Sequence, residues 1–231
     1  MELINYGPEN SAVRWVAYFD LLGTSKLIKS GNIFRVFSAY QTACEKLHNW
    51  KQRHPKVSHC WFSDTFLLYT ADGTAESFAA IEMISRWFMF ALISEEIPVC
   101  GSLAVGTFYA DSKNGVYLGD ALVEAHDWGE NQDWIGYILT PSATDKLEEL
   151  GLPAQQRLNY RKYEVPLKES RSQGNKIAAC VLGNWVLLSG VRNPLIAKLC
   201  KMKKPLEDDR VAAKYARTID FLEKFKFIKQ P

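Results

Sequence analysis

The sequence lacks an excess of charge of one sign, a long apolar run and any paired cysteine motif. Its 28 Lys and Arg nearly balance 26 Asp and Glu, so the formal net charge is only +2. That charge is too small for a surface built mainly to hold nucleic-acid phosphates. No stretch approaches the roughly 18 apolar residues of a membrane span, and the first residues lack the basic and apolar regions of a signal peptide. We therefore predict a soluble, cytoplasmic protein whose partners include neither nucleic acid nor a membrane.

The cysteines also fail to form a recognisable site. There are five, an odd number, and they are widely spaced, with no CxxC pair and no Cys/His cluster at zinc-ligand spacing: Cys44, Cys60, Cys100, Cys180 and Cys200. We predict reduced and mostly buried thiols. The hydrophobic fraction of 47% over 231 residues is that of an ordinary globular protein with its own core. We expect one domain over residues 1–231, with a core of about 13–166 and a C-terminal extension of about 167–231.

Hydrophobic periodicity predicts an alternation of strands and helices. Strands are expected at 14–19, 57–62, 66–70, 98–108 and 134–140, and helices at 33–53, 76–93, 119–128 and 142–150, the last capped by Ser142. The order βαββαβ, followed by αβ, is typical of the split βαβ or ferredoxin-like α+β fold, a mostly antiparallel sheet with its helices on one face. Further strands are expected at 163–166, 177–182 and 185–188. A closing helix at 207–227 should have a solvated basic face.

Two carboxylates fall at turns of this predicted sheet. Asp20 follows the first strand, and Asp64 lies at the tip of the hairpin between residues 57 and 70. The split βαβ order makes that strand and the hairpin neighbours, so the two side chains should lie side by side. Paired carboxylates favour a hard divalent cation such as Mg²⁺, and Gly23-Thr24-Ser25 leads into a helix start suited to phosphate. Aspartate is also common at ordinary turns, so a purely structural role stays open.

These residues resemble the motifs of the class III nucleotidyl cyclases, the superfamily of adenylate and guanylate cyclase catalytic domains. Tyr18-Phe19-Asp20-Leu21-Leu22-Gly23-Thr24-Ser25 is similar to the first metal motif of that family, and Phe62-Ser63-Asp64-Thr65 is similar to the second. Residues 98–106 and 119–125 resemble the strand and the glycine-led helix that follow. Each motif is short, and the specificity lies in their order between about Val13 and Ala143.

The resemblance implies a chemistry and a set of site residues. Family members hold two Mg²⁺ or Mn²⁺ ions, here with Asp20, Asp64 and the backbone of Leu21, and convert a nucleoside triphosphate to a 3′,5′-cyclic nucleotide and pyrophosphate. Substrate contacts would come from Leu21, Leu22, Gly23, Thr24 and Ser25 on the phosphates, from Cys60 near the base, and from Arg161 or Lys162 on the triphosphate. The family places its active sites at a dimer interface, which implies a head-to-tail homodimer with the Gly119 helix contributed by the other subunit.

The chain is most similar to the stand-alone bacterial pyrimidine cyclases of the Pycsar antiphage system, because it is short and has Ser63 before the second aspartate. That likeness implies UTP or CTP as substrate, rather than ATP or GTP, and cUMP or cCMP as a second messenger that activates an effector. Trp61 or Phe62 would narrow the pocket for the base.

The sequence departs from the family pattern at its catalytic pair. The Asn and Arg expected on the helix after Gly119 are Val123 and Asp127, the Arg before the later-strand glycine is Cys100, and the Pro-Arg step is Ile135-Gly136. A lost arginine costs orders of magnitude in rate where it meets a transferring phosphate. Two alternatives therefore stand beside the enzyme: a degenerate homologue that binds a nucleotide or a protein partner without turnover, and a purely structural interaction domain.

Overall fold

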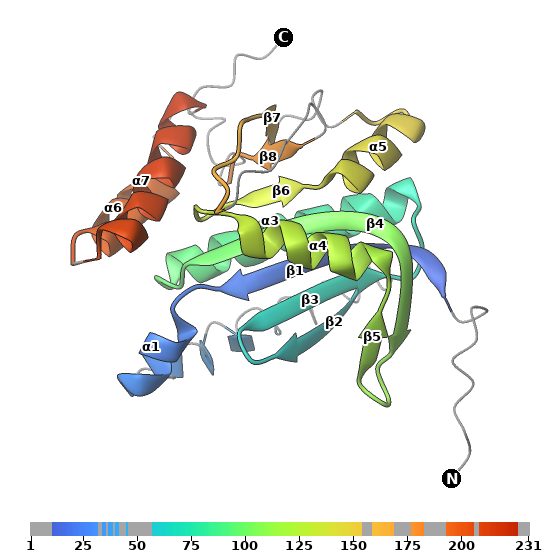
Figure 1. Ribbon diagram of the computed structural model, residues 1–231, viewed down its shortest axis with the longest axis horizontal. Helices are drawn as coiled ribbons and strands as arrows, with labels where there is room; N and C mark the ends of the chain where they lie inside the picture. Colours follow the sequence, from blue (N-terminus) through green and yellow to red (C-terminus); the bar gives the residue numbers. More distant parts are fainter. Residues whose placement is uncertain are drawn as a thin grey trace.

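The computed structural model describes residues 11–31, 57–153, 159–168, 177–182, 193–205 and 208–225, together with residues 34, 35, 37, 38, 40, 41 and 45. Its centre is an eight-stranded sheet in the order β2-β3-β1-β4-β6-β8-β7, with β5 paired to β4 (Figure 1). The strands are β1 (Ala12–Leu21), β2 (Val57–Phe62), β3 (Thr65–Thr70), β4 (Val99–Asp111), β5 (Val116–Leu118), β6 (Tyr137–Leu139), β7 (Tyr160–Lys162) and β8 (Ala178–Cys180).

The first four strands confirm the predicted split βαβ core. Strand β1 lies between β3 and β4 and is antiparallel to both, and β2 completes the hairpin with β3. Beyond this core, β6 pairs in parallel with β4, and β8 and β7 extend the sheet with antiparallel pairs. The hairpin is therefore next to β1, as the order of elements predicted.

The helices cover both faces of the sheet, whereas the sequence predicted one face. They are α1 (Thr24–Lys29), α3 (Ala75–Ser94), α4 (Asp120–Asn131), α5 (Pro141–Glu149), α6 (Pro194–Lys203) and α7 (Asp209–Lys224). Helix α3 lies behind the central strands in Figure 1 and α4 lies in front of them. The reason is the alternation along β1. Trp15, Ala17 and Phe19 join the large core that includes α3, whereas Val16 and Tyr18 pack with residues of α4.

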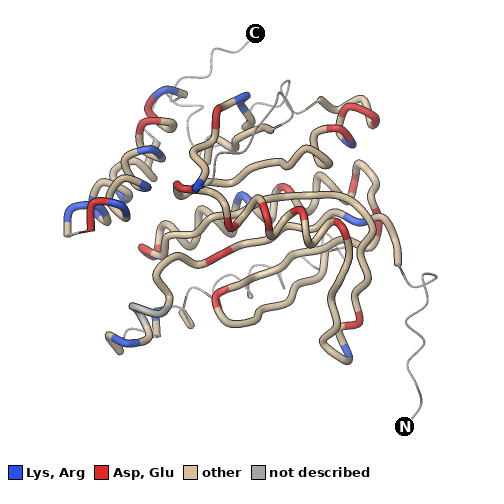
Figure 2. Tube along the Cα trace, in the orientation of Figure 1, with Lys and Arg blue, Asp and Glu red and all other residues tan. Residues whose placement is uncertain are grey.

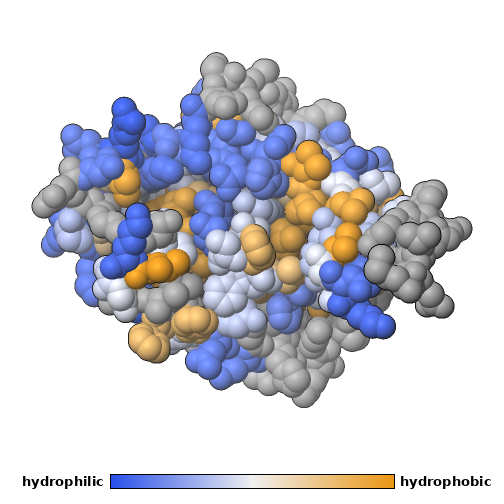
Figure 3. All heavy atoms as spheres, turned by 60° about the horizontal axis from the view of Figure 1, so that its bottom comes forward, coloured by the Kyte–Doolittle hydropathy of each residue, from blue (hydrophilic) through white to orange (hydrophobic). Residues whose placement is uncertain are grey.

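Helix α3 is the most apolar helix among the described residues. By length and composition alone it is able to cross a membrane, but 61% of its most apolar window is buried within the protein. It begins at Thr74, whose hydroxyl accepts a hydrogen bond from the amide of Ser77, as capping residues do. Charged residues fall mainly on helices and turns (Figure 2). The face seen in Figure 3 is largely polar with separate apolar patches.

The segments after residue 140 differ most from the sequence predictions. The expected strand at 163–166 is absent, and β7 lies just before it at Tyr160–Lys162. Helix α6 was not predicted, and the closing helix is α7 at Asp209–Lys224. The hydroxyl of Ser142 accepts from the amide of Val105 rather than capping α5, which begins after Thr140. The expected strand at 185–188 lies outside the described residues, as does most of the expected helix at 33–53.

The described cysteines are free thiols, as predicted. Cys100 and Cys180 are buried, and Cys60 and Cys200 are half-buried. Cys44 lies outside the described residues.

We expect Gly129→Ala to destabilise the fold by about 1–3 kcal/mol. Gly129 lies in α4 directly against β1, and a Cβ atom there would meet Cδ1 of Tyr18 at 2.5 Å. Alanine normally stabilises a helix relative to glycine, so the sign of the effect reports the close approach of α4 to the sheet. Thermal melts measure it, with Val123→Ala on the exposed face of α4 as the control. A melting temperature equal to or above that of the wild type would contradict this packing argument.

Candidate active site

Asp20 and Asp64 lie at neighbouring strand ends. In the antiparallel pair of β1 and β3, Asp20 is opposite Thr65, the residue that follows Asp64. The amide of Leu21 donates a hydrogen bond to the carbonyl oxygen of Asp64 at 2.9 Å. The turn consists of Ser63 and Asp64 alone, with Ser63 at a φ of 57°, a conformation typical of tight hairpins. The backbone thus fixes the position of both aspartates.

The environment of Asp20 is unfavourable for its negative charge. Burial, followed by the nearby charges of Glu130 and Asp64, raises the pKa of Asp20 to about 6, while Lys168 and Lys214 act in the opposite direction. Carboxylates that lie close together favour a bound cation. Among the described residues no three His, Cys, Asp or Glu side chains form a complete ligand group. The arrangement fits Mg²⁺ or Mn²⁺, which take one or two carboxylates and complete their shell with water and phosphate.

A third carboxylate, Glu130, approaches from the last turn of α4. Its Oε1 accepts a hydrogen bond of 2.8 Å from the hydroxyl of Tyr18, two residues before Asp20. The hydroxyl of Thr65 lies 3.4 Å from the same phenol. Burial is the main reason why the pKa of Tyr18 is raised well above its usual value, so this phenol stays protonated as a donor. Sequence reasoning missed Glu130 because only the packing of α4 on β1 brings it here.

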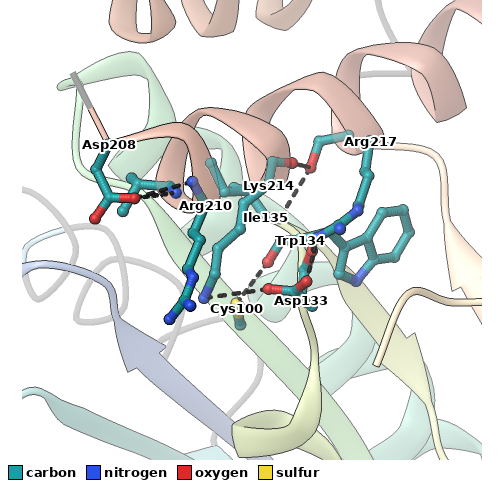
Figure 4. A network of polar contacts seen from close by, with 10 residues as sticks. Cys100, Asp133, Trp134, Ile135, Asp208, Arg210, Lys214 and Arg217 are labelled. Atoms are coloured by element: carbon teal, nitrogen blue, oxygen red, sulfur yellow. Dashed lines mark hydrogen bonds and ion pairs between the residues drawn. The ribbon is translucent and has the colours of Figure 1, made fainter. Parts of the chain in front are cut away.

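Two lysines supply positive charge at the same end of the sheet. The segment of Lys168 is attached to the end of α4, since its amide donates to the carbonyl of Asn131 at 2.7 Å. Lys214 comes from α7 and reaches toward Cys100, with its Nζ 3.8 Å from Oδ1 of Asp133 (Figure 4). The sequence predicted a solvated basic face for this helix. Arg210 and Lys224 are exposed, as predicted, whereas the side chain of Lys214 is only 19% exposed.

Part of the predicted phosphate-binding loop, residues 21–25, already makes hydrogen bonds within the protein. The amides of Leu21 and Leu22 donate to the carbonyl oxygens of Asp64 and Pro98, so neither is available to a phosphate. Gly23 has a φ of 78°, and α1 begins at Thr24, where amides lack intrahelical acceptors. The hydroxyl of Thr24 donates to the carbonyl of Leu21 at 2.8 Å. The amides of Gly23, Thr24 and Ser25 are the part of the loop that fits an anion.

Cys60 lies on the α4 side of the sheet, in a cluster with Tyr18 and Leu67. Trp61 was expected to narrow a pocket beside it, but alternation along β2 turns Trp61 to the other face. There its ring lies 4.1 Å from that of Tyr40. Phe62 is 80% exposed. Neither aromatic ring encloses Cys60 within a single chain.

Arg161 and Lys162 do not lie beside Asp20 in the same chain. They belong to β7, at the far edge of the sheet and four strand positions from β1, which is about 19 Å at the usual spacing. The guanidinium group of Arg161 lies over the ring of Phe225 at 6.0 Å. Within one chain the structure therefore does not bring them beside Asp20. Their contact with a triphosphate stays a prediction.

Helix α4 offers no cation where the resemblance expects one. Val123 is 61% exposed, and the carboxylate of Asp127 lies 3.6 Å from Nδ1 of His126. Cys100 is buried beside Asp20 on β4, and its thiol donates to the carbonyl oxygen of Trp134. Burial, and then the charge of Asp20, raises the pKa of Cys100 to about 12, so position 100 is neutral.

No protein-family model matches the chain, and no curated protein matches it in sequence. Solved structures do match it. They include the guanylate cyclase domain of RhGC from Catenaria anguillulae in complex with GTP, with a TM-score of 0.55, 8% identity and coverage of 74% of this chain and 97% of that one. The adenylyl cyclase CyaB from P. aeruginosa matches with a TM-score of 0.52 and 7% identity, and the match covers 74% of this chain and 94% of that one. Adenylate cyclases from Trypanosoma brucei match with a TM-score of 0.52 and 11% identity, and the match covers 78% of this chain and 91% of that one. The chain has the fold of adenylyl and guanylyl cyclase catalytic domains.

We expect Asp20→Asn to stabilise the metal-free protein above about pH 6 and to leave it unchanged below about pH 3.8. In the folded chain the carboxyl group of Asp20 has a pKa of about 6, against an ordinary value of 3.8. The folded state therefore loses stability as the pH rises through this interval, whereas asparagine has no proton to lose. Solvent screening of the half-buried group reduces the expected gain to about 1 kcal/mol. Thermal melts in chelator from pH 3.5 to 8 measure it.

Asp111→Asn is the control of opposite sign. Hydrogen bonds from the side chain and then the amide of Asn114 lower the pKa of Asp111, so its charge stabilises the fold at neutral pH and this substitution should lower the melting temperature there. Equal melting temperatures for Asp20→Asn and the wild type at pH 8 would show that the ionised carboxylate of Asp20 does not destabilise the folded protein.

Proposed function

We propose that this chain is a metal-dependent nucleotidyl cyclase that converts a nucleoside triphosphate to a 3′,5′-cyclic nucleotide and pyrophosphate. One observation carries the proposal: on a sheet with the cyclase fold, the hydrogen bond from Leu21 to the carbonyl of Asp64 holds two aspartates at adjacent strand ends. The raised pKa of Asp20 supports it, because the fold keeps a carboxylate where only a cation relieves its charge.

The residues would divide the work as follows. Asp20, Asp64 and the carbonyl of Leu21 would hold two Mg²⁺ or Mn²⁺ ions. Bound there, such ions lower the pKa of a hydroxyl and neutralise developing charge on phosphate. The amides of Gly23, Thr24 and Ser25 would bind the phosphates. The 3′-oxygen forms its bond to the α-phosphorus, the bond from that phosphorus to the bridging oxygen breaks, pyrophosphate leaves and the hydroxyl proton is lost to water.

The substrate class we propose is a pyrimidine triphosphate, UTP or CTP, with cUMP or cCMP as the product. The support is the likeness of the motifs to Pycsar-type cyclases and the half-buried position of Cys60, on the α4 face two residues before Phe62. We extend the same likeness to the biological role, a second messenger in antiphage defence.

A homodimer follows from the same proposal. The outer surface of α4 and the adjoining β5 carry exposed apolar side chains: Val123 is 61% exposed and Leu118 is 53% exposed. Two copies arranged head to tail would cover this surface and bring the Gly119 helix of one chain to the aspartates of the other. Val123 and Asp127 would then face the partner's site.

The second candidate function is nucleotide binding without turnover. It is favoured by Val123 and Asp127, which give α4 no positive charge for a transition state, and by the neutral Cys100. In this case the aspartates would bind a metal and a nucleotide that is never converted.

We expect the purified protein with Mn²⁺ to consume one of the four triphosphates, UTP or CTP, and to release a cyclic monophosphate. Asp64→Asn and Asp20→Asn should each lower the rate at least about 100-fold by removing a metal ligand. Chromatography with mass detection measures the products, and Asp111→Asn serves as the control for loss of an exposed aspartate. Full activity in either site variant would remove the metal assignment. Stabilisation by metal and nucleotide without consumption would favour the second candidate function.

We expect Val123→Glu to weaken dimerisation and to lower turnover in parallel, because it places a charge in the surface that two copies would cover. Val13→Glu is the matched control, since Val13 is 50% exposed at the opposite end of β1 from Asp20. Analytical ultracentrifugation and the product assay measure the two effects. A monomeric wild type with full turnover would argue against the dimer.

A further inference from the structure

Helix α7 packs against the loop between α4 and β6, at the end of the sheet where Asp20 lies. The amide of Ile135 donates to the hydroxyl of Thr218 at 2.9 Å, and the ring of Phe221 packs edge-on against Trp134. Gln132 in turn links the indole of Trp134 to the carbonyl of Gly101 in β4. A chain of direct contacts thus sets the place of α7 relative to β4.

Lys214 lies one turn before Thr218 on this helix and extends toward the site. Figure 4 shows its side chain running down from α7, between Arg210 and Asp133, toward Cys100. Cys100 is paired directly with Asp20 across β4 and β1, so the lysine extends toward the strand ends that carry Asp20. The ammonium group is therefore near both strand ends where a metal-bound phosphate would lie.

The charge of Lys214 is only partly matched by its neighbour. Asp133 is the carboxylate nearest to it, but Nζ and Oδ1 are 3.8 Å apart, too far for a hydrogen bond. Asp133 is held more closely by Arg217, which contacts its carboxylate and donates to its carbonyl oxygen at 2.9 Å. Arg217 thus satisfies Asp133, and the positive charge of Lys214 remains available to another anion.

A bound polyphosphate needs such a cation. Two divalent ions together with two carboxylates leave a triphosphate with net negative charge, and phosphoryl transfer depends on fixed positive groups that neutralise it. Val123, Asp127 and Cys100 do not provide one, and Arg161 lies at the far edge of the sheet. Lys168 and Lys214 supply the positive charge at this end, and Lys214 is the one whose side chain extends from α7 toward Cys100.

We propose that Lys214, on the C-terminal helix α7, is a substrate-binding residue that pairs with the phosphates of a metal-bound nucleotide at Asp20 and Asp64. This assignment rests on the proposed function to the extent that phosphate binds at these strand ends. It makes the C-terminal helix part of the active site. A lysine from α7 would then supply the positive charge that the resemblance expects from an arginine on β4 or α4. The carboxylate of Asp133 lies 3.8 Å from Lys214 without a hydrogen bond, and Arg217 pairs with Asp133 when the lysine turns to phosphate.

The test uses pyrophosphate with Mn²⁺ as the probe, in the full-length protein, by calorimetry. Lys214→Met should weaken pyrophosphate binding about tenfold or more, as expected for loss of a charge-assisted contact, and Lys214→Arg should restore most of it. Lys224→Met is the matched control, because Lys224 is an exposed lysine at the far end of the same helix, near Phe225. Melting temperatures verify that each variant is folded.

Binding of Mn²⁺ alone separates a direct contact from an effect through Asp20. If Lys214→Met weakens Mn²⁺ binding by the same factor as pyrophosphate binding, the lysine acts on the metal site only and the proposal is overturned. Unchanged pyrophosphate affinity, or no binding by the wild type, also overturns it. If pyrophosphate binding depends on Lys214 but no triphosphate is cyclised, the phosphate contact stands and the cyclase function fails.

Discussion

The pairing of β1 between β3 and β4 is the constraint on which the rest of the structure depends. It is the longest continuous contact of the sheet, with β4 opposite β1 from Ala12 to Leu21. Because side chains alternate, one face of β1 builds the aromatic core under α3, and the other presents Tyr18 and Asp20 to α4. A shift of one residue would bury Asp20 in the core and expose Phe19. The core therefore fixes the register that places the carboxylate at the site.

Charge balance at this end of the sheet comes from elements that are distant in sequence. Asp20, Asp64 and Glu130 gather there because β1, the hairpin and α4 meet. Lys168 and Lys214 come from a loop and from α7, and both lower the pKa of Asp20 against the effect of burial. The pKa of about 6 shows that these lysines offset only part of the cost. In the proposed function, a bound metal ion would offset the remaining cost of the charge on Asp20.

Strands and helices with a clear local pattern could be predicted from the sequence. The runs around Asp20 and Asp64 alternate or end in turn residues, so the strands, the hairpin and the adjacency of the two aspartates were predictable. Strand β7 has three residues and shows no alternation, and it was placed a few residues too late. Glu130, Lys168 and Lys214 gave no sequence signal, because no spacing relates them to Asp20. Only the packing of α4 and α7 brings them together.

The positions of Arg161 and Lys214 show why a missing arginine on one element is a weak argument for inactivity. Arg161 and Lys162 precede a segment that resembles the family, yet the order of strands puts them four strand positions from β1 in the same chain. Electrostatic stabilisation depends on where a charge lies and not on which element carries it. Cys100 leaves its position on β4 neutral, and the lysine that approaches that position comes from α7, more than a hundred residues later. Loss of a motif residue and loss of its charge are thus separate events in this fold.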